Sequence, residues 1–292
     1  MTDIIPLVSV VVPCYNHQDF VKECLLSVIN QSYKNIQLIV IDDGSKDESI
    51  EIIKKLQEKE GFIFEAQRNI GLTKTLNKAL KKYVQGKYVA FLASDDYWAT
   101  DKIKKQVEYF EANSNYGLLF SNAEIVNKES RIIGRFDEDR LKNNCSLEDL
   151  MLDRHGIPAL TALIKKDVLD EVGSYDESLQ MEDWDMWMRI SERYQLGYMP
   201  EVLAYYRTHS ENTSEKTPLM MKNRFSILQK WKEKKPQLYK EADKYWKLQA
   251  FSTLAVHHKA EALKYLYLNT FNLSNKQFRK SIKKLLFYGW IK

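Results

Sequence analysis

Two adjacent acidic residues stand at the end of an apolar run in this chain. Asp95 and Asp96 follow residues 88–93 after a single serine, Ser94, and carboxylates in a cleft are costly unless they are paired, hydrated or metal-bound. A hard divalent cation is the simplest reason to place both there. Such a cation would suit a diphosphate, because it bridges the oxygens and neutralises a leaving group. An acidic helix N-terminus, favoured by the helix dipole, explains the pair equally well.

A second acidic cluster has the sequence Asp-Asp-Gly-Ser at residues 42–45. Alone, this segment is more typical of a turn that leads into a helix, because Ser45 and Glu48 have the spacing of a capping box. Two such clusters at one edge of a sheet would favour a functional interpretation for both.

A third acidic segment, residues 182–187, interleaves three acids with Trp184 and Trp187. Aromatic faces stack on the apolar faces of sugar rings and carboxylates accept hydroxyl protons, so this composition suits a sugar site. A helix start with both tryptophans packed inward is the alternative, although it explains the acids less well. His209, which follows Arg207 closely, is either a metal ligand or a structural histidine.

Alternating strands and helices must position these clusters. We expect strands at residues 8–12, 36–41, 62–66 and 88–93, separated by helices at about 17–31, 45–56, 72–83 and 100–110. This alternation predicts a mostly parallel sheet flanked by helices. Ligands bind outside the carboxyl ends of such strands, where the polar segments 13–16, 42–45, 68–71 and 94–96 would converge.

The pattern is less regular after residue 115. We expect a hairpin at 117–127 and 131–136, a helix at 146–153, a strand at 158–164, a helix at 182–194 and a strand at 196–206. Beyond residue 213 the sequence predicts helices only, at 219–268 and 274–288. The predicted domains are therefore residues 1–212 and a C-terminal helical extension of residues 213–292.

Composition narrows the classes of protein. The chain has 292 residues and 44% hydrophobic residues, which is enough for a substantial core. Three cysteines without a CxxC pair favour a reducing compartment and give no zinc-site spacing. No apolar run reaches the roughly 18 residues of a spanning helix, and residues 1–6 do not resemble a secretory signal. A cytoplasmic location is expected.

Charge is distributed unevenly along the chain. Residues 213–292 contain 18 Lys and Arg against 5 Asp and Glu, whereas residues 1–212 contain 26 against 35. The basic extension has two interpretations, namely a solvated helical subdomain that covers the sheet and a surface that docks on anionic lipid at the inner face of the cytoplasmic membrane. The docking residues would be Lys276, Arg279, Lys280, Lys283, Lys284, Phe287 and Trp290. No nucleic-acid recognition motif accompanies the charge.

Five motifs in order resemble the motif set of family 2 glycosyltransferases. They are VSVVVPCYN at 8–16, IDDGS at 41–45, NIG at 69–71, SDD at 94–96 and ED at 182–183. Each motif is weak alone, but five at fitting spacing over residues 6–212 are specific. The resemblance implies the GT-A nucleotide-diphospho-sugar transferase fold and an inverting reaction that uses a sugar nucleotide.

The resemblance also implies which residues hold the donor. Pro13 and Tyr15 would line the pocket for the nucleotide base. Asp42 would accept a hydrogen bond from a ring nitrogen of the base, which favours uracil. Arg68 would lie near the base or the diphosphate, and Asp95 would bind the ribose or the donor sugar.

The implied metal site departs from the family pattern at one position. Asp96 would hold Mn²⁺ or Mg²⁺, and His209 matches a histidine that joins the metal shell in some relatives. The usual motif is Asp-any-Asp, but Ser94 replaces its first acid. Because adjacent residues of a straight strand point to opposite faces, Asp95 and Asp96 can reach one ligand only if the chain turns there.

The implied chemistry is transfer of a hexosyl group from a UDP-sugar to a hydroxyl of a glycan or lipid-linked acceptor. Asp183 would be the catalytic base, and Glu182 would position donor or acceptor hydroxyls. The expected setting is bacterial surface polysaccharide synthesis, such as that of lipopolysaccharide, O-antigen or capsule. The donor sugar, the acceptor, the linkage and the oligomeric state stay open.

Two other functions remain as alternatives. A sugar nucleotidyltransferase would need a glycine-rich loop with Lys or Arg after the first strand, and residues 13–16 are not such a loop. A dehydrogenase is disfavoured because no GxGxxG follows the first strand. A catalytically silent scaffold that binds glycan or membrane is the second alternative.

Overall fold

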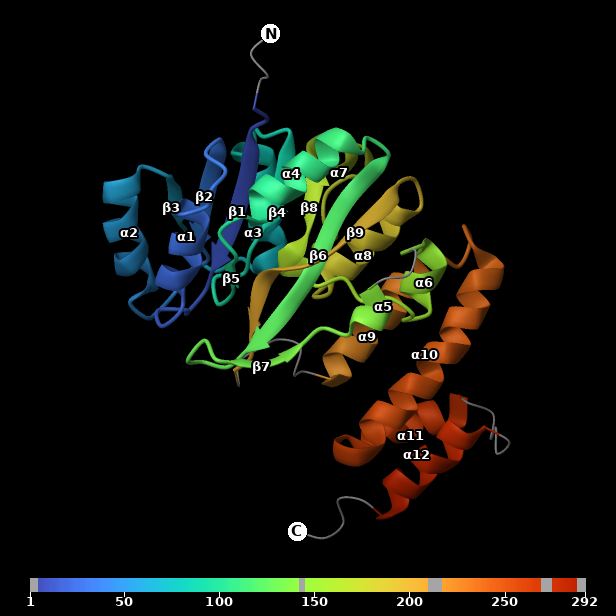
Figure 1. Cartoon of the computed structure of the whole chain (residues 1–292). Coiled ribbons are helices and arrows are strands. Elements are labelled where there is room, and N and C mark those ends of the chain that lie inside the picture. The colour runs from blue at the N-terminus through green and yellow to red at the C-terminus, as the bar shows by residue number, and fades with distance from the viewer. Residues whose placement is uncertain (1–4, 142–144, 210–216, 269–274, 288–292) are drawn as a thin grey trace. The chain divides into compact units, whose positions relative to one another are not determined.

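The computed structural model describes residues 5–141, 145–209, 217–268 and 275–287. The chain forms two compact units (Figure 1). The first contains the chain up to Leu150, His155–Ser178 and Glu182–His209. The second contains Met151–Arg154, Leu179–Met181 and the chain from residue 210 onward.

A nine-stranded sheet is the centre of the first unit. Its strands are β1 (Val8–Cys14), β2 (Ile36–Asp42), β3 (Ile63–Ala66), β4 (Tyr88–Phe91), β5 (Tyr97–Trp98), β6 (Tyr116–Val126), β7 (Ile132–Arg135), β8 (Leu163–Lys165) and β9 (Gln195–Arg207). The order is β3-β2-β1-β4-β8-β6-β9-β5, and β7 pairs with β6. Figure 1 shows the long strands β6 and β9 side by side, in agreement with their parallel pairing.

The predicted parallel sheet is confirmed for β3, β2, β1 and β4. The second half of the sheet is mixed, because β8 runs antiparallel to both of its neighbours, β4 and β6. The predicted hairpin is confirmed as the antiparallel pair β6 and β7. Successive residues of β1 and β2 are buried almost throughout, so both faces of these strands are covered.

Helices follow the strands of the first unit as the alternation predicted. They are α1 (Val21–Ile29), α2 (Ser49–Glu60), α3 (Leu72–Lys82), α4 (Lys102–Ala112), α5 (Glu138–Leu141), α6 (Leu147–Met151), α7 (Lys166–Val172) and α8 (Glu182–Ser191). Helix α1 shows why they form, since Cys24, Leu25 and Val28 recur at helical spacing and are all buried in the core with strand residues.

Two local predictions are wrong. The capping box is absent between the described residues Ser45 and Glu48, because Ser45 Oγ bonds to Asp42 and α2 begins only at Ser49. The strand expected at 158–164 is reduced to β8, because Ala159–Thr161 forms a 3₁₀ turn.

The second unit is formed mainly by helices, which the sequence predicted for this part of the chain. Its helices are α9 (Thr217–Gln229), α10 (Pro236–His257), α11 (Lys259–Leu268) and α12 (Lys276–Phe287). The rings of Phe251 in α10 and Phe278 in α12 lie 5.4 Å apart, and Trp246 Nε1 donates to the carbonyl of Met151 at 2.8 Å. Among the described residues, we find no helix that is both long and apolar enough to cross a membrane.

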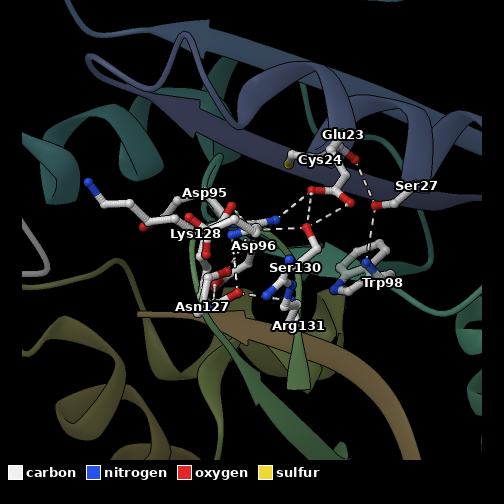
Figure 2. Close-up of polar contacts among 12 residues, drawn as sticks. Glu23, Cys24, Ser27, Asp95, Asp96, Trp98, Asn127, Lys128, Ser130 and Arg131 are labelled. Atoms are coloured by element: carbon white, nitrogen blue, oxygen red, sulfur yellow. Dashed lines mark hydrogen bonds and ion pairs between the residues drawn. The ribbon is translucent and has the colours of Figure 1, made fainter. Parts of the chain in front are cut away.

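One buried arginine joins four segments of the first unit. Arg207, at the end of β9, is 1% exposed, and its backbone N–H donates to Asp96 Oδ1 at 2.8 Å. Its guanidinium donates to the carbonyls of Asp95, Asn127 and Lys128, to the Ser130 hydroxyl and to the Glu23 carboxylate. Figure 2 shows Glu23, Asp95, Asp96 and Ser130 gathered in one place. Arg207 therefore ties the turn after β4 to α1 and to the β6–β7 hairpin.

We predict that Arg207→Met lowers the free energy of unfolding by about 2–4 kcal/mol, because the buried Asp95 carbonyl and the partly buried carbonyls of Asn127 and Lys128 lose their donor. The measurement is urea denaturation followed by circular dichroism. Arg193→Met is the matched control, since the Arg193 side chain is 50% exposed and its pair with Glu171 is at the surface. Equal losses in the two variants would contradict the assigned role of Arg207.

Candidate functional site

The loop after β2 is organised by a buried carboxylate. Asp42 Oδ1 accepts from the backbone N–H of Gly44 at 3.1 Å and of Ser45 at 2.8 Å, and Oδ2 accepts from Ser45 Oγ at 2.5 Å. Gly44 has φ +82°, and a Cβ there would stand 2.6 Å from the backbone nitrogen of Asn69. The Asp-Asp-Gly-Ser cluster is thus the turn that its sequence favoured, with the glycine required by conformation and by space.

The second acid of this cluster holds a different loop. Asp43 Oδ1 accepts from the backbone N–H of Ile70 at 2.8 Å, and Oδ2 accepts from that of Gly71 at 2.9 Å. Gln67 Nε2 also donates to Asp43 Oδ1, at 2.8 Å. This arrangement fixes the loop that carries Arg68, whose side chain is exposed. The segments 42–45 and 67–71 therefore form one hydrogen-bonded unit.

The loop after β1 is joined to the same unit. Asn16 adopts φ +56°, its N–H donates to Ser45 Oγ at 2.8 Å, and its Oδ1 accepts from the N–H of Lys46 at 2.7 Å. Tyr15 is 46% exposed beside this contact, and Pro13 is partly buried. The Tyr15 ring is therefore accessible for stacking on a flat ligand.

The chain turns directly after β4, at Asp95 and Asp96. Such a turn is required if these two adjacent acids are to reach one ligand. The Asp96 N–H donates to the Ala93 carbonyl at 3.1 Å, and Asp96 Oδ1 accepts from the N–H of Arg207. Burial raises the pKa of Asp96 well above its usual range, and the neighbouring Asp95 carboxylate raises it further. Two adjacent buried acids favour a cation nearby, because opposite charge offsets their desolvation and repulsion.

Asp95 faces two histidines. His209 Nε2 lies 2.9 Å from Asp95 Oδ2, and His17 Nε2 lies 3.9 Å from the same oxygen. One ligand atom from each of these three residues falls within 4.8 Å of the others. Imidazole nitrogens and a carboxylate oxygen are donors for Mn²⁺, Fe²⁺ and Zn²⁺, so the residues present fit a divalent metal. The structure brings His209 to Asp95, whereas Asp96 bonds to Arg207.

Glu182 and Asp183 lie at the start of α8. Asp183 Oδ1 accepts from the N–H of Trp184 at 2.7 Å. Burial and the Asp183 charge raise the pKa of Glu182 to about 7. Burial and then these two acids also raise the pKa of Tyr175 well above its usual range. The Tyr175 ring packs edge-on against Phe91, at the carboxyl end of β4, with the centroids 5.6 Å apart. Tyr175 thus links the acids of α8 to the edge that carries Asp95.

The tryptophans of the 182–187 segment belong to the core. Trp184 and Trp187 are buried, so the packed-inward alternative describes them and their faces cannot stack on a sugar. Asp185 is also structural, because it accepts from Arg189 Nε at 2.9 Å. Arg189 in turn donates to the carbonyls of Val172 and Gly173.

The topology places the candidate residues that follow strands at one edge of the sheet. Asp42 is paired with Cys14 at the end of β1, and the turn of Asp95 and Asp96 follows the adjacent strand β4. Pro13, Tyr15 and Arg68 belong to the joined loops of this edge, and His209 follows β9. Asp42 itself is fully buried.

Two residues of this region are not predicted from the sequence. His17 stands one position beyond the polar segment 13–16, which is the only signal for it. Arg207 has no signal besides its place near His209. Its role depends on carbonyls of the turn after β6, which the sequence does not reveal.

Comparisons with known proteins agree on one family. The profile described as Glycosyl transferase family 2 matches residues 9–173. An uncharacterized glycosyltransferase of Methanocaldococcus jannaschii is 30% identical over 248 residues, which cover 83% of this chain and 80% of that protein. Uncharacterized glycosyltransferases of Rickettsia prowazekii and Rickettsia bellii are 29% and 30% identical over 72% of this chain, but only 66% and 31% of their own lengths are matched.

Solved structures share the fold at low identity. Staphylococcus aureus TarS 1–349, in complex with UDP-GlcNAc, has a TM-score of 0.64 and 19% identity, with 96% of this chain and 80% of that chain covered. The mannosyltransferase PcManGT from Pyrobaculum calidifontis, in complex with GDP-Man and Mn²⁺, also has a TM-score of 0.64, with 18% identity and coverage of 97% and 85%. The fold is that of GT-A enzymes. The profile match across more than half of the sequence shows that this chain belongs to glycosyltransferase family 2.

Proposed function

We propose that this family 2 glycosyltransferase inverts configuration as it transfers a hexosyl group from a UDP-sugar to a hydroxyl of a glycan or lipid-linked acceptor. The observation that carries the proposal is the meeting of Asp95 with His209 and His17, at the edge where the loops of Tyr15 and Arg68 are joined. A nucleoside diphosphate needs both features, namely a cation-binding group for its phosphates and a flat, partly apolar surface for its base.

The base pocket would lie along the loops after β1 and β2. Three donors already occupy the oxygens of Asp42, and a carboxylate offers about four lone-pair sites, which leaves one for a ring N–H of the base. Because Asp42 is fully buried, this contact requires one of the joined loops to move when the donor binds. Uracil presents such a ring N–H, so UDP is compatible with this contact.

The diphosphate end would lie at the Asp95 turn. Asp95 and His209, with Asp96 adjacent in the chain, would hold Mn²⁺ or Mg²⁺, and the ion would supply charge neutralisation on the diphosphate. PcManGT is solved with GDP-Man and Mn²⁺, which supports a sugar nucleotide with a divalent ion here. Arg207 keeps the turn in place through the Asp95 carbonyl and the Asp96 carboxylate.

Asp183 would act as the base. It takes the proton from the acceptor hydroxyl while that oxygen attacks the anomeric carbon and the bond from this carbon to the diphosphate breaks. The nucleoside diphosphate leaves from the opposite face, so configuration inverts. Glu182 would hold a donor or acceptor hydroxyl, and a pKa of about 7 lets it donate or accept near neutral pH.

The exposed side chains at the end of helix α12 favour an acceptor that lies at a membrane surface. Leu286 is 57% and Phe287 is 73% exposed at its end, and the buried Leu285 separates them from Lys283 and Lys284. Exposed apolar side chains beside lysines suit the boundary between headgroups and acyl chains of an anionic bilayer. We propose docking on the inner face of the cytoplasmic membrane, in synthesis of a surface polysaccharide. Trp290, which is also predicted to belong to this surface, lies outside the described residues.

A donor panel tests the reaction. We expect UDP release from a UDP-sugar in the presence of Mn²⁺ and a saccharide acceptor, and Asp183→Asn should lower kcat by about 10²–10⁴-fold because it removes the base. UDP binding, measured by calorimetry, should stay near the wild-type value. Asp170→Asn is the control, since Asp170 pairs with Lys166 in α7. Near-normal transfer by Asp183→Asn would exclude the base role, and UDP binding without transfer by the wild type would favour the scaffold alternative.

Stability should depend on pH through Glu182. Its pKa is raised in the folded protein, so its contribution to stability is full below the unfolded pKa and is lost as pH rises toward about 7. We expect the unfolding free energy to fall between about pH 4.5 and 7 by roughly 2–3 kcal/mol, and Glu182→Gln to flatten this dependence. Urea denaturation in metal-free buffer across this range is the measurement, with the exposed Glu177→Gln as control. An unchanged pH slope in Glu182→Gln would refute the assignment.

Sedimentation with vesicles tests the membrane surface. The wild-type chain should pellet with vesicles that contain anionic lipid and stay soluble with neutral ones. Lys283→Glu with Lys284→Glu should abolish pelleting, because the two substitutions reverse the charge beside the exposed end of α12. Lys232→Glu with Lys240→Glu makes the same change of net charge elsewhere and should leave pelleting intact. Equal recovery of wild type in both supernatants would rule out the docking surface.

A further inference from the structure

We propose that His17 is a third protein ligand of the cation site and takes the place of the acid that Ser94 replaces. This arrangement makes the site prefer a transition metal such as Mn²⁺ over Mg²⁺. The inference rests on the proposed function, because it assigns a further ligand to the same site. The motif on this loop ends at Asn16 and does not include His17.

The first step is the orientation of the His17 ring. Its Nδ1 lies 2.8 Å from Ser94 Oγ, the hydroxyl at the position of the missing acid. When Nδ1 carries the proton and donates it to this hydroxyl, Nε2 presents its lone pair on the side of Asp95. A hydrogen bond at the second ring nitrogen is how metal-binding histidines are usually held. Ser94 would therefore act through His17.

The second step is the spacing of the three ligand atoms. Asp95 Oδ2 lies 2.9 Å from His209 Nε2 and 3.9 Å from His17 Nε2, and the set falls within 4.8 Å. Ligands placed about 2.1 Å from one ion stand about 3 to 4 Å apart, so a small adjustment of side chains brings all three into one shell.

The third step is the rigidity of both histidines. The His17 N–H donates to Ser49 Oγ at 3.0 Å, and its carbonyl accepts from the N–H of Val21 at 2.8 Å, where α1 begins. Phe20 stacks on the His209 ring with centroids 5.2 Å apart, and the His17 ring packs edge-on against His209 at 5.8 Å. The rings are thus held by packing before any ion binds, which lowers the entropy lost on binding.

The ligand types set the metal preference. Carboxylate and water oxygens suit Mg²⁺, whereas imidazole suits transition metals, and affinity rises along the first row from Mn²⁺ toward Cu²⁺. Replacement of a carboxylate by an imidazole also removes one negative charge from the site. The binding of Mg²⁺ depends on this charge more strongly than the binding of Mn²⁺ does. The alternative is a structural His17 that only bridges Ser94 and the Asp95 turn. That role predicts a loss of stability without a change in metal preference.

Metal titration of the full chain without nucleotide distinguishes these roles. The probe is Mn²⁺, followed by the loss of the free-ion signal in electron paramagnetic resonance, with Mg²⁺ affinity obtained by competition. We expect His17→Gln to raise the Kd for Mn²⁺ about 10-fold or more and to lower the Mn²⁺/Mg²⁺ preference by a similar factor. His257→Gln, at an exposed histidine of α10, should change neither value. Far-ultraviolet circular dichroism confirms that each variant is folded.

A second variant restores the missing acid. Ser94→Asp combined with His17→Gln should recover binding with a preference shifted toward Mg²⁺, because a carboxylate then replaces the imidazole. An unchanged Kd and preference in His17→Gln would overturn the proposal, and so would the absence of Mn²⁺ binding by the wild type. Neither result depends on catalysis. Mn²⁺ binding by the wild type that His17→Gln leaves unchanged would contradict this inference alone, whereas Mn²⁺ binding without transfer from any sugar nucleotide would contradict the proposed function alone.

Discussion

Burial of two adjacent carboxylates at the end of β4 is the constraint on which the first unit depends. Asp95 and Asp96 are both nearly inaccessible, and the cost of desolvating them must be offset by groups from other segments. The backbone N–H of Arg207 serves Asp96, and His209 serves Asp95. The end of β9 is therefore fixed against the end of β4, although the two segments are far apart in sequence. Asp95 faces imidazole side chains, and among the described residues no lysine or arginine side chain pairs with its carboxylate. A cation bound beside its carboxylate is therefore chemically reasonable.

Acids at neighbouring strand ends serve different purposes in this fold. The carboxylate oxygens of Asp42 and Asp43 accept hydrogen bonds from backbone N–H groups of two loops. These carboxylates therefore shape the surface on which a nucleotide would lie. Asp95 instead faces imidazoles, and Glu182 shares a partly buried site with Asp183. Acidic residues of the first unit therefore differ in their surroundings, since the donors around Asp42 and Asp43 are mainly backbone N–H groups of adjoining loops whereas Asp95 faces side chains from distant segments.

Much of this arrangement could be predicted from the sequence, for physical reasons. Runs of Val and Ile such as residues 8–12 bury both faces of a strand, so their position and parallel pairing follow from composition and alternation. The antiparallel insertion of β8 could not be inferred, because three residues carry too little pattern. The contact of His17 with Ser94 also depends on tertiary structure, since 77 positions separate the two residues. Trp184 and Trp187 show the opposite error, in which an unusual composition invited a chemical interpretation of core residues.

The central claim is that the Asp95 turn is where the cation and the diphosphate meet. Anomalous diffraction at the manganese edge, from a crystal grown with UDP and Mn²⁺, tests it directly. We expect one strong peak in contact with both the Asp95 carboxylate and a phosphate oxygen, with the base beside Tyr15. A bound UDP whose phosphates lie away from Asp95, with the manganese peak elsewhere, would contradict the account.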